Sequence, residues 1–188
     1  MNRLFQAVSL AGVITLAAAA SPGAEIKPVA YGVAPGMTQA AAMDILKGVA
    51  RCHVEKEVLD DGYLPSGTYD LYTVCRLNDG HGNLALRTTS SLLGEQVAEI
   101  ELSFHSQDPA ETTAAKLARD YGVALASAEH VGGEWLWRLS EGVDLTLFVY
   151  PAGDARTVVL RDTALRQQDK LARNAAIGML DRRTGSNG

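Results

Sequence analysis

The chain of 188 residues carries 17 Lys and Arg against 22 Asp and Glu, which gives a net charge of −5 at pH 7. A charge of this size is ordinary for a water-soluble protein, and it excludes the strongly positive field that attracts nucleic acid. The length fits one domain or two small modules that share a core, and a hydrophobic content of 47% predicts a globular fold.

Residues 1–20 have the three parts of a secretory signal peptide. Arg3 supplies a positive charge, an uncharged apolar run extends from Leu4 to Ala20, and the run ends in three alanines. We therefore expect export to a periplasmic or secreted location. Because the run has about 17 residues, the lower limit for crossing a bilayer, an uncleaved membrane anchor is the competing interpretation. After signal cleavage we expect no stable membrane span, since no second apolar run reaches that length.

The first half of the remaining chain predicts a helix followed by strands. Residues 21–35 contain three prolines and are expected to form a flexible lead-in. Thr38 predicts the N-cap of a helix over 39–50, in which apolar residues recur with helical spacing. The segment 55–69 is rich in acidic residues and also contains Gly and Pro, so it predicts a loop. Antiparallel strands are then predicted over 71–77, 83–89 and 97–105.

The strand over 97–105 alternates regularly between apolar and polar residues. One face is expected to pack on the core: Ala98, Ile100, Leu102 and Phe104. The other is expected to face solvent: Glu99, Glu101, Ser103 and His105. A sheet with one solvent-exposed face is typical of antiparallel pairing.

The second half predicts the same kinds of elements. Asp108 is expected to cap a helix, with Pro109 in its first turn and Glu111 completing a capping box. Gly122 is expected to end this helix. Further strands are predicted over 135–139, 145–150 and 157–161, followed by a helix from 163 to about 180 and a disordered tail.

The two halves also share residues in the same order. Residues 75–77 align with 137–139 at an offset of 62, and residues 83–86 align with 144–147 at an offset of 61. We interpret this as a tandem repeat. The expected fold is α+β, with two related helix-plus-antiparallel-sheet units and one sheet face packed on helices. The expected boundaries are 36–105 for unit one, 106–162 for unit two and 163–188 for the C-terminal helix and tail.

Cys52 and Cys75 are the two cysteines of the chain. In an oxidising compartment, two cysteines most simply form one disulfide, which here would close a loop of about 23 residues. Free thiols, or a metal pair that includes the neighbouring His53, are the alternatives.

Unit one carries a short set of residues at characteristic places: Gly36-Met37-Thr38, Ile45-Leu46, Cys52 and Tyr72-Thr73-Val74-Cys75. In these residues it resembles the β-lactamase-inhibitor-protein-like superfamily, which includes a small outer-membrane assembly lipoprotein. The resemblance covers roughly 35–105, and it extends to 106–162 only through the repeat. It implies helices packed on an antiparallel sheet, a disulfide where Cys52 and Cys75 lie, and protein binding rather than catalysis.

The repeat alignment places Trp135 and Trp137 on the face of Thr73 and Cys75, so we expect both to be mostly inside. The opposite face carries the candidate partner-contact residues, which are Tyr72, Arg76, Arg138, Phe148 and Tyr150. Exposed aromatic residues on a sheet face indicate a contact surface. The alternative is that the C-terminal helix covers them.

No motif predicts a catalytic residue, a cofactor or a metal site. A G-x-S-x-G motif is absent and the four histidines are scattered. His105 shares a predicted strand face with Glu99 and Glu101, for which a solvated charge ladder is the ordinary explanation and a metal or acid–base site the alternative. We therefore expect a non-enzymatic exported module that binds another protein, in envelope assembly or as an inhibitor. A periplasmic immunity protein that blocks a toxic enzyme and a small secreted hydrolase are the alternative functions.

Overall fold

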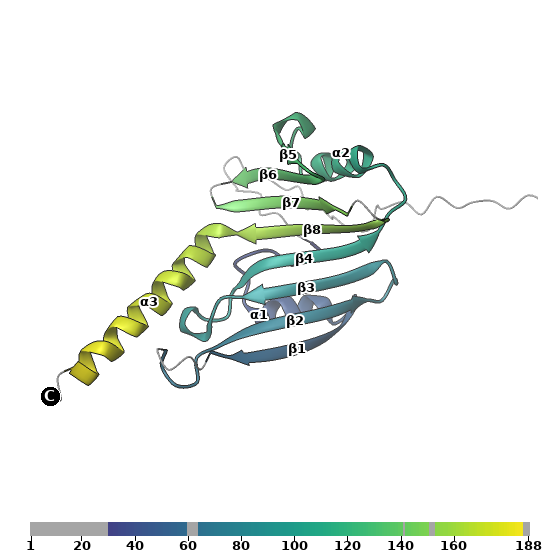
Figure 1. The fold of residues 1–188 in the computed structure, drawn as a ribbon. Coiled ribbons are helices and arrows are strands. Elements are labelled where there is room, and N and C mark those ends of the chain that lie inside the picture. Colours follow the sequence, from purple (N-terminus) through teal and green to yellow (C-terminus); the bar gives the residue numbers. More distant parts are fainter. Residues whose placement is uncertain (1–29, 60–63, 141, 151–152, 186–188) are drawn as a thin grey trace, which may run out of the picture.

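The computed structural model describes residues 30–59, 64–140, 142–150 and 153–185, with side chains to residue 179 (Figure 1). The predicted signal peptide and the first part of the lead-in lie outside these residues. The described part has the predicted α+β fold, in which eight antiparallel strands form one sheet and α-helices pack beside it.

The sheet consists of two four-stranded halves that meet at its centre, in the order β1-β2-β3-β4-β8-β7-β6-β5. The first half contains β1 (Ala50–Val58), β2 (Tyr69–Leu77), β3 (Gly82–Thr88) and β4 (Val97–His105). The second half contains β5 (Glu129–Val131), β6 (Glu134–Ser140), β7 (Val143–Val149) and β8 (Ala155–Asp162). Strands β4 and β8 pair without a bulge, from Glu99 opposite Arg161 to His105 opposite Ala155.

Each half begins with a helix, α1 (Gln39–Leu46) or α2 (Ala110–Asp120), and then forms four antiparallel strands. The two halves thus have the same order of elements, while the tandem repeat itself stays a prediction. Both helices contribute to one core on the same face of the sheet. Its centre is a cross-strand row of side chains that are at most 1% exposed: Thr73, Leu86, Ile100, Leu160, Leu145 and Trp137.

The two edge strands were not predicted. The helix predicted over 39–50 ends at Leu46. Residues 50–58 form β1, although residues 55–58 of this strand were assigned to a loop. Most residues of β1 and all of β5 are exposed. An edge strand is often rich in charged residues, so neither segment shows the apolar alternation that marks a buried strand.

The start of the second helix and the end of the lead-in also differ from expectation. Asp108 does not cap α2: the flanking residue is Pro109, and the Asp108 carboxylate instead pairs with Lys116. Residues 30–35, expected to be flexible, include a tight turn in which Ala30 and Val33 exchange backbone hydrogen bonds of 2.8 and 2.9 Å. Both side chains are buried, so this segment belongs to the core.

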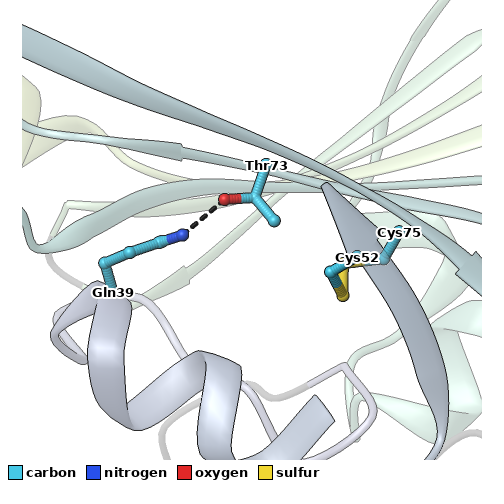
Figure 2. Close-up of a disulfide and its surroundings, with 4 residues drawn as sticks. All are labelled: Gln39, Cys52, Thr73 and Cys75. Carbon is cyan, nitrogen blue, oxygen red and sulfur yellow. Dashed lines mark hydrogen bonds between the residues drawn. A yellow bond between two sulfur atoms is a disulfide. The ribbon is translucent and has the colours of Figure 1, made fainter. Parts of the chain in front are cut away.

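Cys52 on β1 lies directly opposite Cys75 on β2, and the two form a disulfide (Figure 2). Two residues before Cys75, Thr73 accepts a hydrogen bond from the Gln39 amide of α1. The disulfide therefore attaches the exposed strand β1 to the strand that is hydrogen-bonded to α1.

Among the described residues, no helix has both the length and the apolar character needed to cross a membrane.

Replacing both cysteines with alanine removes the covalent link between β1 and β2. Because the bridge spans 23 residues, the chain-entropy model predicts a loss of roughly 3 kcal/mol in the free energy of unfolding. Urea unfolding measures this loss, and hydrogen exchange should show that β1 amides lose protection first. The double variant, unlike the wild type, should not respond to a reductant. An unchanged wild-type melting temperature after complete reduction would contradict a stabilising bridge.

Candidate functional site

The sheet face opposite α1 and α2, which we call the open face, carries the candidate contact residues. Side chains alternate between the two faces of a strand, so residues next to buried core positions belong to the open face. In β2, Thr73 and Cys75 are buried, whereas Val74 and Arg76 between and beside them are exposed. Tyr72 is partly exposed on this same face.

The structure spreads the five candidate residues across the open face and does not gather them into one cluster. Arg76 and Phe148 lie in one cross-strand row, separated by β3, β4 and β8. Tyr72 and Arg138 lie in a second row, with Arg87, Glu99, Arg161 and Asp144 between them. From the usual strand spacing, the residues of the first pair are about 19 Å apart.

An apolar corner lies at the second half of the open face, formed by the exposed residues Val131 and Tyr150 and the half-buried Phe148. Val131 pairs with Glu134, which pairs with Phe148, so this corner spans β5, β6 and β7. Val131 is 79% exposed and Tyr150 is 52% exposed. Sequence analysis missed Val131 because a three-residue edge strand has too few positions to show alternation.

The C-terminal helix α3 (Thr163–Gly185) does not cover this corner. It begins where β8 ends (Figure 1). It contacts the short 3-10 helix η1 (Ser91–Leu93), β4 and β7. Phe148 lies near the other end of the sheet, opposite Thr157 close to the start of β8. The alternative in which the C-terminal helix covers Phe148 and Tyr150 is therefore wrong.

Glu99 is buried on the open face, although the sequence predicted a solvated side chain. Its side chain is only 7% exposed. Its Oε2 accepts hydrogen bonds from Arg161 of β8 at 2.6 Å and from Arg166 of α3 at 2.8 Å, and its Oε1 lies 3.4 Å from Arg87 of β3. Arginines from three other elements therefore neutralise and cover this carboxylate.

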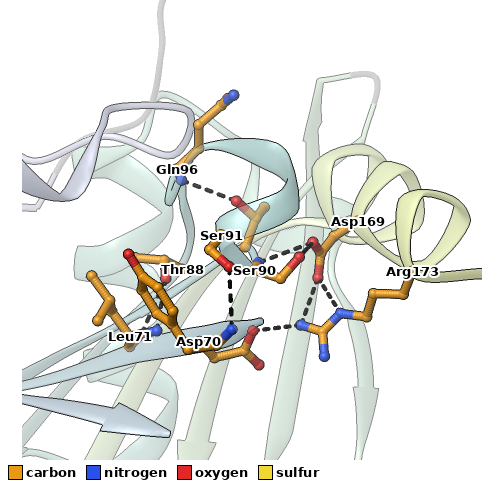
Figure 3. Close-up of polar contacts among 10 residues, drawn as sticks. Asp70, Leu71, Thr88, Ser90, Ser91, Gln96, Asp169 and Arg173 are labelled. Atoms are coloured by element: carbon orange, nitrogen blue, oxygen red, sulfur yellow. Dashed lines mark hydrogen bonds and ion pairs between the residues drawn. The ribbon is translucent and has the colours of Figure 1, made fainter. Parts of the chain in front are cut away.

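Asp169 fastens α3 to the sheet (Figure 3). Its Oδ1 accepts hydrogen bonds from the Ser90 backbone N–H at 2.9 Å and the Ser90 hydroxyl at 2.5 Å, while its Oδ2 pairs with Arg173. Arg173 also donates to Asp70 of β2 at 2.7 Å. Burial disfavours the Arg173 charge, but the bonds to Asp70 and Asp169 outweigh that effect and raise the pKa of Arg173.

A groove of about 500 Å³ lies between α3 and the open face. Tyr72 and Arg87 line it from the sheet, and Arg166, Lys170 and Arg173 line it from α3. Arg87 lies over the Tyr72 ring, 4.7 Å from its centroid. The groove therefore connects one candidate contact residue to the arginines around Glu99.

The proposed grouping of His105 with Glu99 and Glu101 does not form. His105 Nδ1 lies 2.9 Å from Asp154 Oδ1. This exposed hydrogen bond lowers the pKa of Asp154. Glu99 is bound by arginines instead. Trp135 and Trp137 are 5% and 1% exposed, so both are inside, as expected from their alignment with Thr73 and Cys75.

Comparison with protein-family models, with curated proteins and with solved structures gives no match for this chain. The function is therefore argued from the surface geometry, and the superfamily resemblance stays a prediction.

Replacing Asp169 with alanine should destabilise the attachment of α3. The change leaves the Ser90 N–H buried without its acceptor and removes one of the two acids that pair with Arg173, which together cost about 2–4 kcal/mol. Urea unfolding measures the loss, and Gln168→Ala on the exposed side of the same turn is the matched control. If both variants unfold at the same urea concentration, Asp169 does not have this role.

Proposed function

We propose that this protein is an exported, non-enzymatic binding module whose open sheet face contacts another protein. The observation that carries the proposal is that α1 and α2 pack on the other face and α3 lies at one end of the sheet. Open-face residues such as Val74 and Arg76 are therefore exposed, whereas Thr146, Thr157 and Val159 at the centre of this face are buried. On the open face lies the apolar corner, where Val131 is 79% exposed. Exposed apolar groups on a sheet face favour a contact role.

The size of the open face supports a protein partner. Eight strands at the usual spacing make a sheet about 34 Å wide, and a seven-residue strand is about 23 Å long. The area obtained by multiplying this width by this length is close to the roughly 800 Å² that one partner buries in a standard protein interface. A surface of this area suits a folded protein better than a small molecule.

The disulfide supports the proposed location, because such bonds persist in oxidising compartments such as the periplasm or the extracellular space. Helices packed on an antiparallel sheet are also the architecture that the resemblance implies. Envelope assembly and enzyme inhibition, the two settings suggested by that resemblance, both require protein binding.

Replacing Phe148 and Tyr150 with serine should weaken the capture of the partner from envelope extract. Aromatic residues that anchor an interface often contribute enough that losing both lowers the affinity by roughly tenfold or more. Quantitative pull-down after cross-linking measures the change. Leu125→Ser, at a residue that is 39% exposed and lies on 3-10 helix η2 (Leu125–Ser127), is the matched control.

Equal capture by the wild type and a folded Phe148→Ser/Tyr150→Ser variant would contradict a contact at the apolar corner. Thermal melting of each variant establishes that it is folded before capture is compared.

A further inference from the structure

We infer that the groove beside α3 binds a carboxylate-bearing segment of the partner protein, through the arginines that surround Glu99. This inference rests on the proposed function and names the chemistry of the partner. Arg87 and Arg166 line the groove and form the proposed binding site. Arg161 also pairs with Glu99 but does not belong to the groove lining.

The arginines around Glu99 carry more charge than that carboxylate can neutralise. Arg87, Arg161 and Arg166 all contact Glu99, so three positive charges meet one negative charge, an excess of 3 − 1 = 2. Asp144 lies opposite Arg161 in the sheet and offsets part of this excess. The remaining positive charge therefore lies mainly on Arg87 and Arg166.

Both of these arginines keep hydrogen-bonding capacity for a ligand. The Arg87 and Arg166 side chains are 56% and 52% exposed, whereas the Glu99 side chain is 7% exposed. A guanidinium has five N–H donors, and its planar geometry suits bidentate binding of a carboxylate. Lys170, one helical turn after Arg166, adds a further positive charge to the groove wall.

Apart from Glu99, the acids that line the groove lie toward Arg173 and not at Arg87 and Arg166. Asp70 and Asp169 both pair with Arg173, and Asp169 also accepts two hydrogen bonds from Ser90. Glu57 lines the groove from β1, the edge strand, away from Glu99 on the central strand β4. The end of the groove at Arg173 is therefore acidic, and the end at Arg87 and Arg166 is basic. An acidic side chain binds at the basic end.

The dimensions favour a segment of protein over a small apolar ligand. Small-molecule pockets of similar volume are mostly lined by apolar and aromatic side chains. Charged and polar side chains line most of this groove, and it adjoins the open face through Tyr72. An acidic loop of a protein docked on the open face could thus extend into the groove without a gap.

The experiment titrates the full chain with a fluorescent oligoglutamate peptide at low ionic strength, where charge screening is weak. In Arg87→Gln/Arg166→Gln the affinity should fall by roughly tenfold or more, because both guanidinium contacts are lost. Arg161 stays to neutralise Glu99 in this variant. Lys47→Gln/Arg119→Gln removes the same amount of charge from exposed positions on the helix-covered side and should change the affinity by less than about twofold.

Three results would overturn the inference: equal loss in both double variants, equally tight binding of an oligolysine peptide, and displacement of the peptide by inorganic phosphate at the same charge concentration. The last result would assign the arginines to a free anion. Circular dichroism checks folding, and Arg87→Gln alone replaces the double variant if that variant is unfolded. Peptide binding is measured without the partner, so its failure is distinct from a failure of partner capture.

Discussion

The pairing of β4 with β8 is the constraint on which the rest of the structure depends. It joins two four-stranded halves and aligns Ile100 with Leu160 on the face covered by helices, and Glu99 with Arg161 on the open face. Because strand side chains alternate with a period of two, a slip of one residue would exchange these faces. Ile100 would then be exposed and Glu99 would lie in the apolar core. One register therefore produces both a continuous core and a continuous open face.

The open face contains two chemically different regions at opposite ends of the strands. The apolar corner around Phe148 lies toward the start of β8, and the arginines that hold Glu99 lie toward its end, where α3 begins. Asp169 holds α3 in the position that forms one wall of the groove. A partner that matches both regions must present apolar and acidic groups at fixed separation, which favours selectivity over indiscriminate binding.

The sequence predicted those elements whose local pattern is strong. The alternation of β4 placed that strand, and the Thr38 cap placed the start of α1. The alignment with Thr73 and Cys75 identified the buried Trp137. Strands β1 and β5 lack such a pattern because they lie at the edges of the sheet. The burial of Glu99 was not predictable, since Arg161 and Arg166 lie 62 and 67 residues away and no local pattern encodes their register. The sequence predicted Phe148 and Tyr150 of the apolar corner but not Val131. Val131 comes near Phe148 only through cross-strand pairing, which the local sequence does not reveal.

Site-specific photo-cross-linking in envelope extract tests the central claim, that the open face contacts another protein, most directly. A photoreactive residue is placed at Val74 or Tyr150 on the open-face side, and at Lys47 or Arg119 on the helix-covered side, all of which are exposed. The proposed contact predicts a discrete cross-linked partner from position 74 or 150 and none from 47 or 119. Cross-linking to the same partner only from positions 47 and 119 would contradict it.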